Sequence, residues 1–268
     1  MSIYFRNGEN KEIEDNSKVK IIHFESNNSY EVKCTKRRQN NLSRYKRKSK
    51  NEWIDTATGE IIRSKEYGSK NTNNMRRALK KLEYVIRNNF TGANNELHMV
   101  LTTEEEIHSY DVIQKRVDTF LKQLKQQYNG IEYIYVLELQ EERNSWHAHV
   151  LLKDMLHKRL YINYNEINAL WRGNGTKIKK VYDIDGLAHY LAKEKTKTST
   201  PKFKKLYYKS RGIKTVEVEQ KTYKEFKEDI KETHNMTVAK TLNIKSTDSD
   251  YTINSIKTEI WTNIHSKK

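Results

Sequence analysis

The sequence predicts a mixed α+β fold, in which short apolar strands alternate with amphipathic helices between about residues 74 and 235. Residues 110–128 carry apolar side chains at helical intervals, which is typical of a helix with one buried face. Residues 131–139 and 146–152 are apolar runs joined by a polar turn, and this pattern predicts two neighbouring antiparallel strands. With 35% hydrophobic residues, the 268-residue chain can build a core of about 150 residues but not one for its whole length.

Each further element follows from its own periodicity and from the residues that end it. Asn129 and Gly130 end the segment 110–128, and Gly92 follows a helical pattern at 74–88. In chain order, the expected elements are helix 74–88, strand 97–102, helix 110–128, strand 131–139, strand 146–152, helix 163–171, strand 177–182, helix 185–195, strand 214–218 and helix 223–232. The central order, strand-helix-strand-strand-helix-strand, predicts a ferredoxin-like (split βαβ) antiparallel sheet with helices packed on it.

Composition divides the chain into a central domain and two polar flanks. Residues 1–72 are rich in Asn, Lys and Ser, and we expect a basic, loosely ordered N-terminal extension with a small hairpin around 53–55 and 60–62. Residues 73–235 hold the predicted sheet and helices. Residues 236–268 have weak patterning and are expected to form a polar C-terminal tail.

The charge of the chain points to a polyanionic partner. The formal net charge is +16, and it is unevenly distributed. Residues 33–50 contain nine Lys or Arg and no acid, whereas residues 193–214 contain nine with one acid, Glu194. Such clusters suit contacts with phosphates, which dominate the affinity of proteins for nucleic acids. The alternative is that the lysines only keep the chain in solution.

Several classes of protein and cofactor are not expected. The single cysteine, Cys34, excludes an internal disulfide and a thiolate zinc site. The polar N-terminus and the lack of a long apolar run predict a cytoplasmic protein with no signal peptide and no membrane partner. The glycine-containing segment 173–177 is too short for a phosphate-binding loop, so no nucleotide cofactor is expected.

A pair of histidines suggests a metal site in the strand 146–152. Side chains alternate along a strand, so His147 and His149 share a face and can bind one ion. Glu138 ends the preceding strand and can lie beside them across the hairpin, with Gln140 as a reserve ligand. Two imidazoles and a carboxylate in an open arrangement suit Mg²⁺ or Mn²⁺. The carboxylates of the following turn are expected to be solvated: Glu141 and Glu142.

A tyrosine in the helix 185–195 is the candidate nucleophile. Tyr190 lies three residues before Lys193, so both occupy one face of the helix, while Leu187 and Leu191 can bury the opposite face. A neighbouring cation lowers the pKa of a phenol or neutralises the charge that develops on a phosphate under attack. The alternative nucleophiles are Tyr207 and Tyr208, but they lie in a basic segment with Arg211, where contacts with nucleic acid are the more natural role.

Together these residues resemble the HUH endonucleases, and specifically the rolling-circle replication initiators of small plasmids and phages. The resemblance covers about residues 74–220 and rests on an apolar strand that ends in threonines (97–103), Glu138 and Gln140, His147-Ala148-His149, Tyr190 with Lys193, and the segment 208–212. Ala148 is smaller than the residue usual at that position. Positions 186 and 194 are Gly and Glu, so the second tyrosine of some phage initiators is absent and the resemblance is to the single-tyrosine type.

The resemblance implies an HUH endonuclease fold and a metal-dependent DNA nickase. Tyr190 would attack single-stranded or cruciform origin DNA, leaving a 5′-phosphotyrosyl link and a 3′-hydroxyl that primes rolling-circle replication. The ion would be held by Glu138, His147 and His149, and a host helicase and DNA polymerase would be the partners. Two alternatives stay open, namely a single-tyrosine HUH transposase and a non-catalytic ferredoxin-like module that binds nucleic acid.

Overall fold

The computed structural model describes residues 4–5, 12–37, 45–49, 52–63, 72–140, 142–172, 175–197, 204–233, 235–248 and 252–263. The chain divides into two compact units. The first, called here the central unit, contains residues 24–27 and 73–216; the second, the terminal unit, contains residues 1–23, 28–72 and 217–268. Both combine antiparallel sheets with helices, so the predicted α+β class is confirmed.

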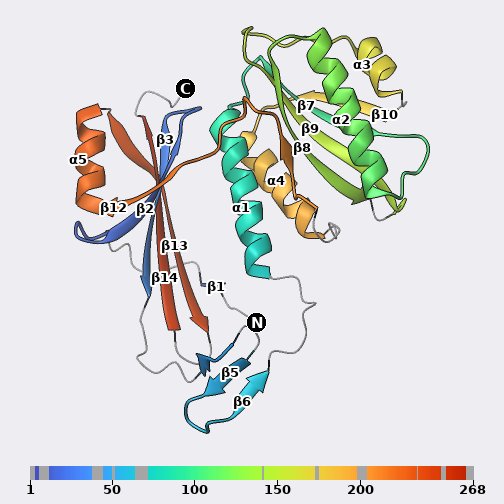
Figure 1. The fold of residues 1–268 in the computed structure, drawn as a ribbon. Helices are drawn as coiled ribbons and strands as arrows, with labels where there is room; N and C mark the ends of the chain where they lie inside the picture. Colours follow the sequence, from blue (N-terminus) through green and yellow to red (C-terminus); the bar gives the residue numbers. More distant parts are fainter. Residues whose placement is uncertain are drawn as a thin grey trace. The chain divides into compact units, whose positions relative to one another are not determined.

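A five-stranded antiparallel sheet forms the centre of the central unit, with the order β10-β7-β9-β8-β11 (Figure 1). Its strands are β7 (Glu96–Thr102), β8 (Ile131–Gln140), β9 (Ser145–Asp154), β10 (Gly175–Lys180) and β11 (Tyr208–Lys209). Strands β7 and β9 lie side by side, and β10 lies outside β7. This arrangement, with a helix after β7 and another after β9, is that of a ferredoxin-like split βαβ fold.

Helices cover both faces of this sheet. They are α1 (Thr72–Asn89), α2 (Tyr110–Gln127), α3 (Tyr164–Trp171) and α4 (Ile184–Lys197). Helices α2 and α3 pack on the face that bears Ala148 and Val150 of β9, whereas α1 and α4 pack on the face that bears Leu151. Figure 1 shows the two pairs of helices on opposite sides of the sheet. Neighbouring residues of β9 therefore face two different cores, because side chains alternate along a strand.

The elements predicted for the central unit agree closely with the observed ones. The predicted helix 110–128 is α2, and the strands predicted at 131–139 and 146–152 are β8 and β9, each slightly longer than expected. Gly130 has φ +87° and turns the chain from α2 into β8, a backbone conformation that favours glycine. The two-residue strand β11 was not predicted, and the strand expected at 214–218 begins only at Val218.

The terminal unit is built on a six-stranded sheet with the order β1-β13-β14-β3-β2-β12. Its elements are β1 (Tyr4–Phe5), β2 (Lys18–Phe24), β3 (Ser29–Arg37), β12 (Val218–Thr222), α5 (Tyr223–Thr233), β13 (Met236–Asp248) and β14 (Thr252–Asn263). Helix α5 packs on the sheet through Phe226, whose ring makes edge contacts with Tyr30 and Trp261. A separate three-stranded sheet contains β4 (Tyr45–Arg47), β5 (Glu52–Asp55) and β6 (Ile61–Arg63).

This unit differs from the loosely ordered extension and the polar tail that the sequence suggested. Residues 12–37 and 236–263 contain paired strands, and β3 pairs with β14 from the other end of the chain. Polar side chains hide this sheet in the sequence, because some of them are buried in it. The carboxylate of Glu259, for example, accepts hydrogen bonds from the hydroxyl of Tyr223 at 2.6 Å and from Nε1 of Trp261 at 3.2 Å. The expected hairpin around 53–62 is present as β5 and β6.

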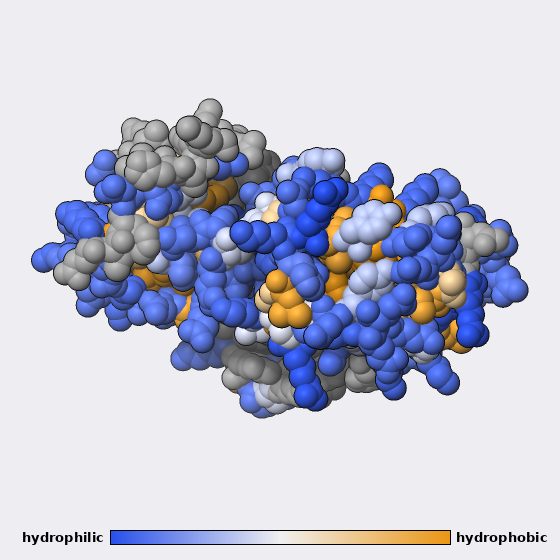
Figure 2. Space-filling model, turned by 90° about the horizontal axis from the view of Figure 1, so that it is seen from above, coloured by the Kyte–Doolittle hydropathy of each residue, from blue (hydrophilic) through white to orange (hydrophobic). Residues whose placement is uncertain are grey.

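Hydrophilic residues cover most of the face that Figure 2 shows, in line with the 32% of charged residues in the chain. Within the part of the chain that the structure describes, no helix combines the length and the apolar character needed to cross a membrane.

Candidate metal centre and nucleophile

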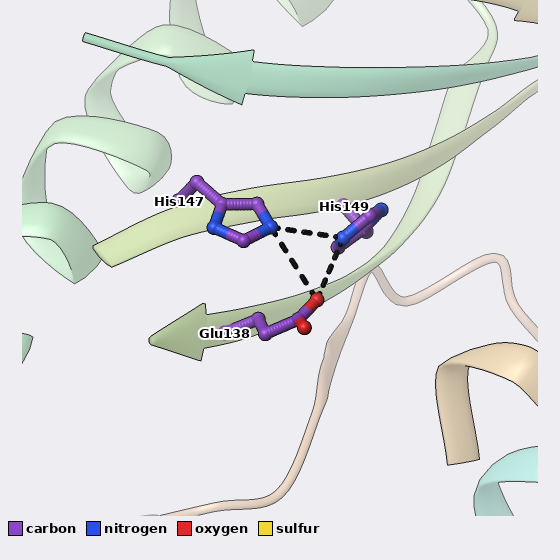
Figure 3. Close-up of side chains that lie close together, drawn as sticks. All are labelled: Glu138, His147 and His149. Atoms are coloured by element: carbon purple, nitrogen blue, oxygen red, sulfur yellow. Dashed lines mark hydrogen bonds and ion pairs between the residues drawn. The ribbon is translucent and has the colours of Figure 1, made fainter. Parts of the chain in front are cut away.

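Three predicted metal ligands meet on the hairpin of β8 and β9. Glu138 lies directly opposite His147 in the register of the two strands, and His149 is two positions further along β9. Oε2 of Glu138 lies 2.8 Å from Nε2 of His149 and 3.3 Å from Nε2 of His147 (Figure 3). The two Nε2 atoms are 3.1 Å apart. The sheet face that bears these side chains also bears Leu151 and is called the site face from here on.

This donor set fits a divalent cation. One ligand atom from each of the three residues lies within 4.8 Å of the others. Two imidazole nitrogens that face each other across a carboxylate oxygen cannot all be satisfied by their own protons, whereas a cation accepts electron pairs from all three. Two nitrogens and one oxygen leave positions open for water or a phosphate, which suits Mg²⁺ or Mn²⁺ better than a closed structural site. Glu138, His147 and His149 can therefore hold a metal ion.

The charge state of Glu138 also suits a ligand. Burial of the side chain raises the pKa of its carboxyl, but the hydrogen bonds from His147 and His149 outweigh burial and hold this pKa well below its usual range. The carboxylate is thus ionised at neutral pH. It offers a full negative charge inside a largely buried site, where only 13% of its side chain is exposed.

A third histidine, which the sequence analysis did not single out, adjoins the cluster. His98 lies on β7, opposite Leu151 of β9, and so it shares the site face. Its Nε2 is 3.2 Å from Nδ1 of His149, and the two ring planes differ by 18°. Burial, together with His149 and Lys179, lowers the pKa of His98 to about 4, so this imidazole is neutral at pH 7. One histidine in an apolar strand gives no signal in the sequence that separates it from a packing residue.

The candidate nucleophile lies beside the same cluster. Helix α4 packs on the site face through Ala188 and Leu191, which are buried, and this packing leaves Tyr190 44% exposed. The ring centroid of Tyr190 is 5.9 Å from that of His149. Lys193 follows three positions later in α4, but its side chain lies outside the described residues. The roles of Tyr190 and Lys193 in catalysis stay predictions.

The other predicted tyrosines are placed differently. Tyr208 of β11 pairs with Tyr135 on the opposite face of the sheet, and the two rings stack with centroids 4.8 Å apart. Tyr207 is partly buried against the core of the site face, and Arg211 is exposed in the following turn. Neither tyrosine belongs to the metal cluster. Contacts of Tyr207, Tyr208 and Arg211 with nucleic acid stay predictions.

The segment 208–212, which carried part of the resemblance, anchors the edge strand β11. The amide of Ser210 donates to the carbonyl of Tyr133 at 3.0 Å, and its hydroxyl accepts from the amide of Tyr133 at 2.8 Å. The amide of Gly212 donates to Oε2 of Glu132 at 3.0 Å. A Cβ at position 212 would lie 2.6 Å from the Glu132 carboxyl carbon, so this contact requires glycine.

The remaining predicted residues lie around the hairpin that joins β8 and β9. Gln140, the reserve ligand, is opposite Ser145 at the end of β8, and Glu142 is exposed in the turn. Glu141 lies outside the described residues. Much of the two basic segments does as well, including residues 38–44 and 198–203.

Cations line one edge of the site face. In the register of β10 and β7, Lys177 lies opposite Val100 and Lys179 lies opposite His98, so both lysines project on the site face. Both side chains are exposed. A phosphate chain that reaches the cluster from the β10 edge would meet these two charges.

The fold and the cluster together define an α+β protein with a candidate metal centre and an adjacent tyrosine. Residues 96–199 match a family model of replication-associated proteins, described by the name ORF2. The matched part runs from the start of β7 to the residues just after α4 and includes Glu138, His147, His149 and Tyr190. A search of the curated proteins and a search of the solved structures each gave no match.

Proposed function

We propose that this chain is a replication initiator that nicks single-stranded DNA and becomes covalently attached to it through Tyr190. One observation carries the proposal most directly: Tyr190 adjoins His149 on the site face, next to three residues that can hold a metal ion. The similarity of residues 96–199 to replication-associated proteins supports the biological context. We further propose that the chain acts on origin DNA of a small replicon.

The lysines of β10 are suited to bind the substrate. Lys177, Val100 and His149 lie in one row across three neighbouring strands. Strands in a sheet are about 4.8 Å apart, so Lys177 is about 10 Å from His149 along this row. Lys179 extends the same edge beside His98. These charges can hold phosphates on either side of a nucleotide that lies at the cluster, and they leave the bases unread.

The chemical step is a transesterification. The hydroxyl oxygen of Tyr190 gives up its proton to solvent and forms a bond to the phosphorus, while the bond between phosphorus and the 3′-oxygen breaks. The departing 3′-oxygen takes up a proton, which yields a 3′-hydroxyl and a 5′-phosphotyrosyl diester. A Mg²⁺ or Mn²⁺ ion bound by Glu138, His147 and His149 would supply polarisation of the non-bridging phosphate oxygens. The exposure of Tyr190 allows DNA to reach the hydroxyl.

The products define the partners of this reaction. A free 3′-hydroxyl can prime a DNA polymerase, and the tyrosyl ester conserves the energy needed to rejoin the strand. Because the sequence contains no phosphate-binding loop, we propose that a separate host helicase unwinds the DNA.

Capture of the covalent intermediate tests the proposal. The full chain would be incubated with Mn²⁺ and end-labelled single-stranded oligonucleotides of randomised sequence, because the target sequence is not known. A labelled band that survives denaturing electrophoresis, with the label on a peptide containing Tyr190, is the expected result. If the chain binds the oligonucleotides but never forms an adduct, it is a non-catalytic nucleic-acid-binding module and the proposal is wrong.

A further inference from the structure

We propose that His98 is a positioning residue, which accepts a hydrogen bond from Nδ1 of His149 and thereby directs Nε2 of His149 to the metal ion. This inference rests on the metal site of the proposed function. It adds a residue from β7 to a site that otherwise comes from β8, β9 and α4.

The two nitrogens of His149 have different neighbours. Nε2 lies 2.8 Å from the Glu138 carboxylate, at the centre of the cluster, and Nδ1 lies 3.2 Å from Nε2 of His98. A neutral imidazole carries one proton, and a nitrogen that binds a metal must offer its lone pair. The proton of His149 must then sit on Nδ1, where it needs an acceptor. Nε2 of His98 is placed to be that acceptor.

The ring geometry supports this assignment. The planes of His98 and His149 differ by 18°, with centroids 5.4 Å apart. In nearly parallel rings at this separation, an N–H in the plane of one ring can point along the in-plane lone pair of the other. The contact is therefore a hydrogen bond between ring edges rather than face-to-face stacking.

His98 is not itself placed as a ligand. Its Nε2 contacts the side of the His149 ring that faces away from Glu138, so one imidazole separates it from the cluster. Residues in this position tune metal sites indirectly, because they fix the tautomer and the orientation of the ligand that they contact.

The second histidine of the cluster lacks this support. Nδ1 of His147 is buried and has no hydrogen-bond partner among the described residues. The two histidines are thus unequal, since His149 is held from β7 and His147 is not. Because His98 lies on a central strand, between β9 and β10, its own position is fixed by the sheet.

Binding of Mn²⁺ to the full chain, measured by electron paramagnetic resonance of the free ion, tests this role. His98→Phe keeps a planar ring but removes the acceptor, and its affinity for Mn²⁺ should fall about 10-fold or more. His98→Gln returns a carbonyl oxygen near the position of Nε2 and should restore affinity to within about threefold of the parent. The matched control is His157→Gln, which removes an exposed histidine from the loop after β9 and should leave affinity unchanged. Urea unfolding of each variant would verify that the fold is retained.

The outcomes separate this inference from the proposed function. If the parent chain binds no Mn²⁺, the metal site and the nickase proposal are both wrong. If the parent binds Mn²⁺ and His98→Phe binds it equally well, only the role of His98 is wrong. Equal losses in folded His98→Phe and His98→Gln would also overturn the role, because the ring shape rather than the acceptor would then matter.

Discussion

The ring of Tyr190 meets the ring of His149 nearly edge to face, at a centroid distance of 5.9 Å and an interplanar angle of 74°. The two residues come from different elements, since Tyr190 lies on α4 and His149 on β9. Burial of Ala188 and Leu191 against the site face sets the rotation of α4 that makes this contact possible. The apolar face of the helix therefore places the candidate nucleophile at the candidate metal centre.

Removal of the Tyr190 hydroxyl should eliminate the chemistry but preserve DNA binding. Tyr190→Phe is expected to form no covalent adduct with single-stranded DNA, because the nucleophilic oxygen is gone while the aromatic packing remains. Fluorescence anisotropy should show an affinity close to that of the parent. Tyr182→Phe is the control, because Tyr182 is 84% exposed in the loop before α4 and should form adduct at the parental rate. Adduct formation by Tyr190→Phe would assign the nucleophile elsewhere, with Tyr207 and Tyr208 the next residues to test.

Adduct formation should depend on a divalent cation and on all three residues of the cluster. Excess chelator is expected to abolish the adduct, and added Mg²⁺ or Mn²⁺ should restore it. His147→Ala, His149→Ala and Glu138→Gln should each reduce the rate by about 100-fold or more, because each removes part of the electrostatic stabilisation of the transferred phosphate. The exposed His108, whose Nδ1 contacts the carbonyl of Asn144 in the hairpin turn, provides the control His108→Ala. Undiminished nicking in chelator would contradict the metal assignment.

Loss of the β10 lysines should weaken DNA binding in a way that depends on salt. Each phosphate contact contributes about −0.7 to the slope of log K against log salt for single strands. Lys177→Gln and Lys179→Gln are each expected to reduce the magnitude of this slope by about 0.7 in equilibrium titrations. Lys122→Gln makes the same change of charge on an exposed residue of α2, on the opposite side of the sheet, and should leave the slope unchanged. A slope that responds equally to all three variants would mean that the charge acts only at long range.

The sequence allowed the central unit to be predicted well because its signals are local. Residues 110–128 repeat with the helical period, and β8 and β9 are joined by a short turn, so their pairing required no contact between distant segments. The alternation of β9 was enough to place His147 and His149 on one face and Ala148 in the core. The position of Tyr190 beside His149 followed from the chain order of the elements, but the contact itself depends on how α4 packs.

Two parts of the structure could not be predicted in this way. The terminal unit pairs β3 with β14, and each strand alone buries too few apolar residues to be distinguished from a polar segment. Its buried carboxylates, Glu31 and Glu259, interrupt the expected pattern of apolar residues. The contact of His98 with His149 is likewise invisible in the sequence, because it depends on the register between β7 and β9. Pairing between distant segments is the information that both cases lack.

The acid sensitivity of the central unit should depend on Glu132, which joins α2, β8 and the turn after β11. Its carboxylate accepts hydrogen bonds from Nζ of Lys125 at 2.8 Å and from the amide of Gly212 at 3.0 Å. Burial raises the pKa of this carboxyl, but the hydrogen bonds from Lys125, Ser210 and Gly212 outweigh burial and lower the pKa below its ordinary value. The ionised form is therefore more stable in the folded state than in the unfolded chain.

The sign of the effect follows from proton uptake. As the pH falls, Glu132 is protonated first in the unfolded chain, so its contribution to stability is complete above the ordinary glutamate pKa and is lost as the pH falls through the folded-state pKa. Glu132→Gln should lower the free energy of unfolding by about 2 kcal/mol at pH 7, because it removes hydrogen bonds to a charged group. At pH 3 the difference from the parent should be smaller, since the parent is then losing the same interaction.

Urea unfolding followed by circular dichroism at the two pH values measures this difference. Glu105→Gln is the control, because Glu105 is exposed in the loop between β7 and α2, and this change should alter stability little at either pH. A loss of stability in Glu132→Gln that is equal at pH 7 and pH 3 would show that the side-chain shape, and not the charge, holds β11 against β8. A loss that shrinks with acid would instead identify the ionised Glu132 as the group that fastens the edge strand to the sheet carrying the candidate site.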